Sequence, residues 1–366
     1  MIARRAVLIK LPRGKCDVDY VKRLMALANL AYRGYEVWVP NMPRTIQHQL
    51  YDFRDFKDSL VFGAAPKRWF ARTWVPLKTL RIYGDGSRKG DKSAPAVLDF
   101  RSNVIRLRQV CRDEPGYSIE LPMPSWVIER VKEGGVIKYA MIGLKGDKPY
   151  LALVAERVVK PYEPSDYMLV VDVNSWGNGV AWGLIRGGNI IKWKPERPNL
   201  REIDNIYNLS VVLSRKYGAL RKLGLGLAEE GGVLWHGVRN TKRRLYAKLR
   251  DHAQKLAHRL AKKALRHRAL VIIDDMIEES RRELLEEKIP SGLAKTYLAG
   301  LREFVRLLTT QLRWYGVPYR FRRLPSTICP VCNHELTQVE GRTMVCNNCG
   351  FRAPRDKVPI YWAVKL

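Results

Sequence analysis

The sequence predicts a two-part protein of the α/β plus β class. Residues 1–160 alternate short β-like runs with turn signals, whereas residues 161–366 combine strand-like runs with long helical tracts. Two Cys-x-x-Cys pairs near the C-terminus add a small metal-binding module. We therefore expect an N-terminal β-barrel-like domain with a helical insertion, followed by a mixed α/β domain that contains a four-cysteine ribbon.

The β-like runs of the first part are separated by glycine-containing turns. They cover residues 5–11, 96–100, 104–107, 136–144 and 150–154. A helical segment at residues 18–35 interrupts them, which places a helical insertion at about residues 17–60. Residues 161–166 contain two prolines and a serine and are predicted to link the two parts.

Three strand-like runs joined by tight turns open the second part, at residues 167–173, 180–185 and 190–193. A long helical tract then covers residues 237–268, and the apolar run 270–273 ends in two aspartates. A helix at residues 291–315 and a strand at residues 317–321 precede the cysteines. This order is typical of a mixed α/β layout.

The charge of the chain points to a polyanionic partner. Lys and Arg outnumber Asp and Glu by 66 to 36, which gives a formal net charge of +30. So large an excess opposes folding by self-repulsion and is usually retained because nucleic acid neutralises it. No apolar run approaches the roughly 18 to 20 residues of a membrane-spanning helix, so we expect an intracellular protein that does not act in a membrane.

Four of the six cysteines form two pairs of metal-ligand spacing, and the other two stand alone. The four are Cys329, Cys332, Cys346 and Cys349. Each Cys-x-x-Cys turn presents two thiolates to one tetrahedral metal, so a ribbon at residues 326–352 is expected to hold a structural Zn²⁺. Zinc is favoured over iron, although the sequence leaves iron open. With four thiolates the metal has no free position for catalysis.

Three aspartates form a second candidate site. Asp172 lies inside the first strand of the second part, Asp274 ends a later apolar strand, and Asp356 follows the last cysteine by seven residues. A carboxylate in such an apolar strand is costly to bury unless a cation binds it. Two Mg²⁺ ions held by shared carboxylates can drive phosphodiester hydrolysis. Taken singly, each aspartate could instead cap a helix or a turn. Asn174 shares a strand face with Asp172 and is expected to support the site.

The helical tract 237–268 carries twelve Lys or Arg and one acid, Asp251. Its apolar residues recur every three or four positions, so one face packs and the other is predicted to follow a phosphate backbone. A solvated helix would usually mix the two signs of charge. The predicted nucleic-acid-binding residues are Arg239, Lys242, Arg243, Arg244, Lys248, Arg250, Lys255, Arg259, Lys262 and Lys263.

The order of these parts resembles the TnpB (OrfB) family of insertion-sequence-encoded RNA-guided nucleases, relatives of the type V CRISPR effectors. Ser326 to Cys332 is similar to that family's entry into its ribbon, and Cys349-Gly350 to Arg355-Asp356 to its exit. Asn333 stands where the family usually has glycine, and Asn accepts the same left-handed conformation. The resemblance covers about residues 165–364.

The resemblance implies an RNase H-like (RuvC-type) nuclease domain at residues 161–325 and 353–366, with the zinc ribbon inserted at 326–352 and buttressing Asp356. It implies a wedge-like β-barrel at residues 1–160. It further implies an RNA-guided DNA endonuclease from a transposable element, with catalytic Mg²⁺ on Asp172, Asp274 and Asp356, a guide RNA and a target DNA. Such a protein is expected in the prokaryotic cytoplasm, on the nucleoid when bound to DNA, as a monomer or a dimer.

Two alternatives stay open. Asp274 stands where the family usually has glutamate, which is one methylene longer, and the residues after Asp356 also depart from the family pattern. A nuclease-weak RNA-guided DNA-binding regulator is therefore one alternative. The other is a guide-free, structure-specific RuvC-like nuclease, which would carry no discrete RNA.

Overall fold

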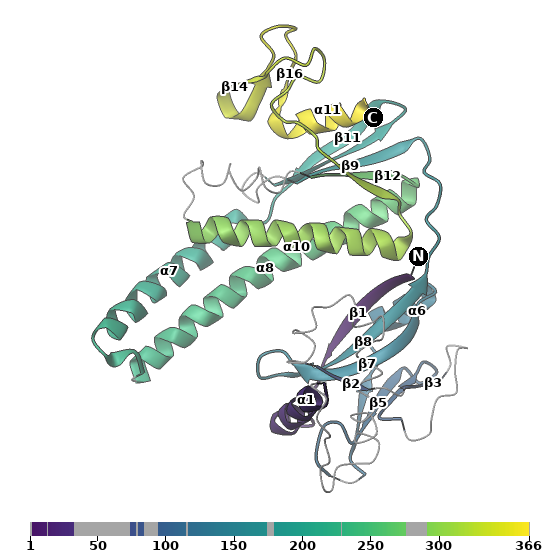
Figure 1. Ribbon diagram of the computed structural model, residues 1–366, viewed down its shortest axis with the longest axis vertical. Helices are drawn as coiled ribbons and strands as arrows, with labels where there is room; N and C mark the ends of the chain where they lie inside the picture. The colour runs from purple at the N-terminus through teal and green to yellow at the C-terminus, as the bar shows by residue number, and fades with distance from the viewer. Residues whose placement is uncertain are drawn as a thin grey trace. The chain divides into compact units, whose positions relative to one another are not determined.

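The computed structural model describes residues 2–12, 14–32, 74–77, 80–83, 94–114, 116–173, 179–227, 229–275 and 291–365. Within it the chain divides into two compact units, Met1–Val158 and Val159–Leu366 (Figure 1). Across the described ranges, none of the helices combines the length and the apolar character needed to cross a membrane.

One antiparallel sheet of the first unit joins strands from both ends of that unit. Its strands are β1 (Ile2–Lys10), β8 (Pro149–Val158), β7 (Val136–Leu144) and β2 (Trp74–Leu77), in that order. Helix α1 (Val18–Tyr32) contacts β7 and β2. The predicted helix at residues 18–35 is thus confirmed as far as Tyr32, and most of the insertion expected beyond it lies outside the described residues.

The other sheet of this unit is made from the middle of its sequence. It consists of β3 (Leu80–Tyr83), β4 (Ala96–Asp99), β5 (Val104–Arg108) and β6 (Ser118–Pro122), and the helix α6 (Ser125–Lys132) follows. Strand β3 is parallel to β4, and the remaining pairs are antiparallel. Burial alternates along β6, as expected for a sheet with one face on a core. The described residues therefore form two four-stranded sheets, and their closure into a barrel stays a prediction.

A five-stranded mixed sheet is the centre of the second unit. Its order is β11 (Asn189–Glu196), β10 (Val180–Arg186), β9 (Tyr167–Val173), β12 (Leu270–Asp274) and β13 (Tyr319–Arg322). The first three strands are antiparallel hairpin neighbours, whereas β12 and β13 run parallel to β9. The predicted mixed α/β layout is confirmed. Its two central strands, β9 and β12, are mostly buried, and apolar except for Asp172 and Asp274, as is typical of strands that are covered on both faces.

Three long helices connect these strands. Helices α7 (Leu200–Lys222) and α8 (Glu229–His267) form a hairpin through the short turn η1 (Leu225–Leu227), and α10 (Ser291–Tyr315) packs against α8 (Figure 1). The buried positions of α8 include Val238, Thr241, Leu245 and Leu249, at the three- to four-residue spacing of one helix face. The opposite face is left to the charged residues.

The last helix of the chain packs into two hydrophobic cores, that of the ribbon and that of the five-stranded sheet. The ribbon has strands β14 (Thr337–Val339), β15 (Thr343–Val345) and β16 (Arg352–Pro354), with the turn η2 (Glu340–Arg342) between the first two. The turn η3 (Arg355–Lys357) then leads into α11 (Val358–Val364). Val358 lies in the ribbon core, while Ile360 and Ala363 lie in the core of the five-stranded sheet. Helix α11 therefore fixes the ribbon to the sheet.

Candidate functional site

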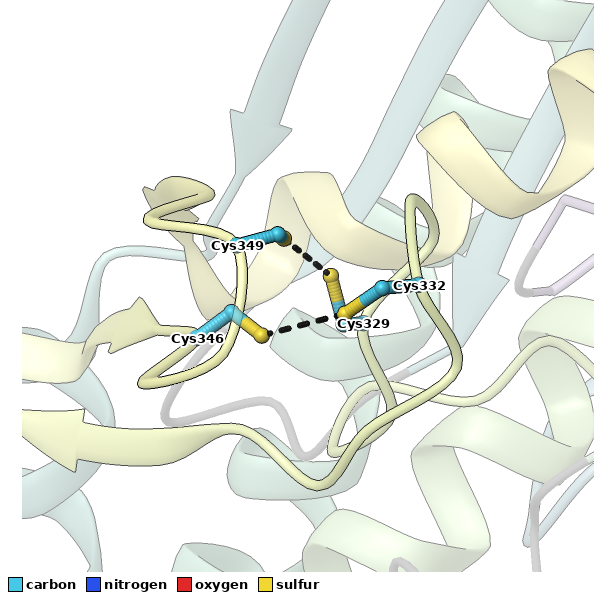
Figure 2. Close-up of side chains that lie close together, drawn as sticks. All are labelled: Cys329, Cys332, Cys346 and Cys349. Atoms are coloured by element: carbon cyan, nitrogen blue, oxygen red, sulfur yellow. Dashed lines mark hydrogen bonds between the residues drawn. The ribbon is translucent and has the colours of Figure 1, made fainter.

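The four predicted metal-binding cysteines converge in the ribbon (Figure 2). The Sγ atoms of Cys329 and Cys349 are 3.6 Å apart, those of Cys332 and Cys346 are 3.3 Å apart, and all four lie within 4.8 Å of one another. Tetrahedral Zn²⁺ with Zn–S bonds of about 2.3 Å requires sulfurs about 3.8 Å apart. The cluster fits a structural zinc. Within the described ranges, no second group of three or more His, Cys, Asp or Glu side chains meets the same criterion.

The local backbone explains how each pair points inward. The N–H of Asn333 donates to the carbonyl of Cys329, and the N–H of Gly350 donates to that of Cys346, each over 3.0 Å. Both turns need a left-handed residue, and Asn333 has φ 62° while Gly350 has φ 73°. The expectation that Asn333 substitutes for glycine here is confirmed.

The thiols are electrostatically unequal without a cation. The pKa of Cys332 falls to about 5, because the Asn348 amide and the backbone near His334 donate to its sulfur. The backbone of Phe351 lowers the pKa of Cys349, but desolvation and the other three sulfurs raise it to about 12. A divalent cation bound by the four sulfurs would remove this inequality, since metal binding deprotonates the remaining thiols.

Asp172 and Asp274 lie side by side in the central sheet. Ile273 of β12 pairs with Val171 of the parallel strand β9, so the next residues on the two strands are the two aspartates. Residues in register on parallel strands point to the same face, and neighbouring strands are about 4.8 Å apart. Both side chains are buried, with residue exposures of 2% and 3%. The topology therefore places two buried carboxylates together at the carboxyl ends of parallel strands.

Asp356 is held by a different partner. It lies in η3 with an exposure of 8%, and its Oδ1 accepts a hydrogen bond of 2.8 Å from the guanidinium of Arg342. The turn η3 contacts β10, whose Ala181 pairs with Asp172. Among the described residues only the four cysteines are grouped closely enough to hold a metal ion as they stand, so the joint role of the three aspartates stays a prediction. Asn174, predicted to support them, lies outside the described residues.

Two arginines near these acids were not predicted from the sequence. Arg342 belongs to the ribbon hairpin, and only its position between the two cysteine pairs could have drawn attention to it. Arg322 ends β13 in direct register with Asp274, so Asp172, Asp274 and Arg322 follow one another across three strands. The alternating Tyr-Arg-Phe-Arg pattern of that strand is its sequence signal. Asp274 is also oriented by the N–H of Leu324, which donates to its Oδ1 over 2.9 Å.

The basic tract of α8 divides into two parts. Six of its ten predicted binding residues contact the protein itself. Lys248 pairs with Glu202, Arg250 with Glu303, Lys255 with Asp251 and Arg259 with Glu196, while Lys262 and Lys263 lie over the rings of Tyr315 and Trp182. The other four, Arg239, Lys242, Arg243 and Arg244, are exposed and form no ion pair with any described residue. Exposed basic side chains thus lie along the whole of α8, and the four of the predicted set that form no ion pair lie in its N-terminal half.

Comparisons with known proteins agree with this architecture. The family model "Cas12f1-like, TNB domain" matches residues 302–359, which include the four cysteines and Asp356. A solved Cas12f1–sgRNA–target DNA complex matches with a TM-score of 0.51 and 9% identity over 95% of this chain and 82% of that chain. Among curated proteins, none matches.

Two further solved structures share less of the chain. CasPhi-2 (Cas12j) bound to crRNA matches with a TM-score of 0.42 and 9% identity, over 76% of this chain and 63% of its own. A Cas12i–crRNA–dsDNA complex matches with a TM-score of 0.31 and 10% identity, over 52% of this chain and 30% of its own. Residues 302–359 therefore contain a Cas12f1-like TNB domain, and the chain has a Cas12f1-like fold, which supports the resemblance to TnpB-like relatives of the type V effectors.

Proposed function

We propose that this protein is an RNA-guided DNA endonuclease that hydrolyses phosphodiester bonds with Mg²⁺. The observation that carries the proposal is the pair of buried carboxylates, Asp172 and Asp274, in register at the ends of parallel strands. A buried pair of like charges is costly, and a divalent cation offsets that cost. The Cas12f1-like domain and the solved Cas12f1–sgRNA–target DNA complex support RNA and DNA as partners.

In this proposal the central sheet is an RNase H-like scaffold of the RuvC type. Residues 161–325 and 353–366 form the nuclease domain, and residues 326–352 form the inserted zinc ribbon. Residues 1–160 form the wedge-like barrel, with a recognition insertion at about 17–60. Its gene belongs to a transposable element, and the protein acts in the cytoplasm on nucleoid DNA. The order of the five strands, with three antiparallel and two parallel, supports the scaffold.

Mg²⁺ bound between such carboxylates lowers the pKa of an attacking water and stabilises charge on the phosphate. Asp172 and Asp274 would hold the ion, and the hydrogen bond from Leu324 fixes the rotation of the Asp274 carboxylate. Asp356 would complete the site from the start of α11. Its ion pair with Arg342 keeps its charge compensated before a cation binds, and this guanidinium can then stabilise the scissile phosphate.

The ribbon positions Asp356 rather than reacting itself. A zinc ion held by its four sulfurs would have no free position for water or phosphate. The indole Nε1 of Trp362 in α11 donates to the carbonyl of Ile328 over 2.8 Å, and Phe351 meets Tyr361 edge to face. Because α11 is fastened to both cores, the position of Asp356 depends on an intact ribbon.

The test begins with the RNA. The chain is purified with its co-purifying RNA, that RNA is sequenced, and plasmids carrying a complementary target with randomised flanks are incubated with Mg²⁺. We expect a discrete RNA and breaks at matched plasmids alone, lost with EDTA and in Asp172→Ala. A discrete RNA with tight target binding but no nick would instead favour the RNA-guided regulator. Cleavage of branched DNA without any discrete RNA would favour the guide-free nuclease.

The regulator is kept as a second candidate because of one observation. Asp356 is paired with Arg342 at 2.8 Å and is not grouped with the other two aspartates. A site that stays in this arrangement would bind DNA without cutting it. Cleavage by Arg342→Ala but not by the unaltered chain would identify this state.

A further inference from the structure

A row of two aromatic and two cationic side chains runs along the exposed face of α8. Trp235, Arg239, Lys242 and Tyr246 are spaced i, i+4, i+7 and i+11, so at 100° per residue they fall on one side of the helix. With a rise of about 1.5 Å per residue, the two rings are about 16.5 Å apart along the axis. Arg243 borders the same row.

Both rings are exposed, and that of Trp235 also contacts a neighbouring ring. Trp235 has 47% and Tyr246 has 51% of its surface exposed, which is unusual for side chains that bury so much area when they can. The Trp235 ring lies 5.4 Å from that of Tyr217 in α7, at an interplanar angle of 36°. Such a contact holds the indole in place while it leaves a large part of its surface available to a ligand.

The charge around the rings has one sign. Residues 231–250 contain six Lys or Arg and no Asp or Glu. Arg239, Lys242 and Arg243 form no ion pair with any residue that the structure describes, whereas Arg250 and Arg259 pair with Glu303 and Glu196. Like charges three and four residues apart on a helix repel each other. A polyanion lying along this half of α8 would remove that repulsion.

The combination of rings and cations discriminates between ligands. A duplex, whose bases are paired and stacked, uses only the cations, because its base faces are already covered. A protein partner that docks on apolar rings would meet the unpaired cations and bury their charge at a cost. An unpaired strand uses both kinds of side chain, since phosphates contact the cations and bases stack on the rings.

We propose that this face of α8 binds an unpaired stretch of nucleic acid, with phosphates on Arg239, Lys242 and Arg243 and bases stacked on Trp235 and Tyr246. The spacing of about 16.5 Å equals about five steps of a stacked strand at 3.4 Å. The two rings therefore stack on bases separated by several nucleotides. This inference rests on the proposed nucleic-acid binding and is independent of cleavage.

The test measures binding in EDTA, so that a chain unable to cleave still gives a result. The full chain, freed of nucleic acid by high salt, is titrated into fluorescein-labelled dT20, rU20 and a 20-base-pair duplex, with fluorescence anisotropy as the readout. We expect Trp235→Ala and Tyr246→Ala each to weaken single-strand binding by roughly 5- to 100-fold. Duplex affinity should stay within about twofold, and Trp235→Phe should restore single-strand binding.

Matched variants separate stacking from charge and from folding. Val233→Ala, on the opposite side of the same helix and 66% exposed, should leave every affinity unchanged. Lys242→Ala should weaken single strand and duplex alike and reduce the salt slope by about 1, whereas the ring variants should keep the slope. If a ring variant lowers the melting temperature, Tyr246→Leu, which preserves bulk and helix propensity, replaces it and should show the same selective loss.

Two results would overturn the inference. One is single-strand affinity unchanged in Trp235→Ala and Tyr246→Ala with a normal melting temperature. The other is an equal loss for single strand and duplex, which would mean that the rings only support the helix. A stronger effect on rU20 than on dT20 would assign the site to RNA, and the reverse would assign it to DNA. If the ring variants lose single-strand affinity selectively but the parent chain cleaves no DNA, this inference is supported and the proposed nuclease activity is refuted.

Discussion

The close contact between α11 and the central sheet depends on one missing side chain. A Cβ added to Gly183 of β10 would lie 2.4 Å from Cγ2 of Ile360 and 3.1 Å from its Cδ1. Carbon atoms normally approach to about 3.5 Å, so Gly183→Ala must displace α11 or Ile360 by about 1 Å. Asp356 lies two residues before the start of this helix, so the displacement reaches the candidate catalytic site.

Overpacking of this kind costs about 1–3 kcal/mol. For a unit of this size, each kcal/mol lowers the melting temperature by roughly 2–4 °C, so we expect Gly183→Ala to melt about 2–12 °C lower. Differential scanning fluorimetry measures this shift. The cleavage rate of the same sample should fall by more than the decrease in its folded fraction accounts for. Gly232→Ala in α8 is the control, because nothing lies within 4 Å of its added Cβ.

A double-mutant cycle identifies the cause. Ile360→Leu removes the Cγ2 branch that meets the new methyl group and keeps the side-chain volume. The double variant Gly183→Ala/Ile360→Leu should therefore be more stable than the sum of the single effects predicts. Strictly additive effects, or a Gly183→Ala protein as stable as the parent chain, would refute this reasoning.

Three further predictions concern the ribbon, the ion pair and pH. Cys346→Ser should lose zinc, measured by metal analysis, and should expose the ribbon to protease while the first unit stays intact; retention of one zinc per chain would contradict the cluster. Arg342→Lys should reduce cleavage while target binding is kept, since an ammonium lacks the planar fork that faces Asp356 and a phosphate; equal cleavage rates would exclude this role. Burial lowers the pKa of His252 below 6.5, so its contribution to stability is complete above pH 6.5 and is lost as the pH falls through its folded value. Urea unfolding at pH 7.5 and pH 5.5 measures the stability lost on acidification. This loss should be smaller in His252→Gln than in the parent chain, and equal losses in the two proteins would exclude His252 as a source of the pH dependence.

The sequence predicted best where a single local pattern decides the structure. The apolar run of β9 and the doubled Cys-x-x-Cys spacing each allow few alternatives, and both are found as expected. Short elements were missed. Strand β2 contains Pro76, which argues against a strand, and it is tolerated because β2 is the edge strand of its sheet. Helix α7 also went unpredicted, and it buries only Ile203, Ile206 and Ser210, so its apolar stripe is narrow.

The candidate site was harder to predict because residues that pair with each other in the structure are distant in sequence. Nothing near Arg259 indicates that Glu196 pairs with it, and nothing near Asp356 indicates Arg342. A uniform basic tract in the sequence is therefore a helix whose basic side chains near the N-terminus form no ion pair with any described residue, while several nearer the C-terminus pair with acids of the same chain. By contrast, the neighbourhood of Asp172 and Asp274 follows from strand ends alone, once β9 and β12 are known to be parallel.

The most direct test of the whole account is cleavage by Asp274→Asn. Asparagine has the shape of aspartate and keeps an oxygen for the N–H of Leu324, so folding and target binding should be preserved. It removes the negative charge that would bind Mg²⁺ beside Asp172. Single-turnover cleavage of a target matched to the co-purified RNA should fall at least about 100-fold, with target affinity unchanged. Cleavage at the rate of the parent chain would contradict the assignment of Asp274 and the metal-dependent mechanism built on it.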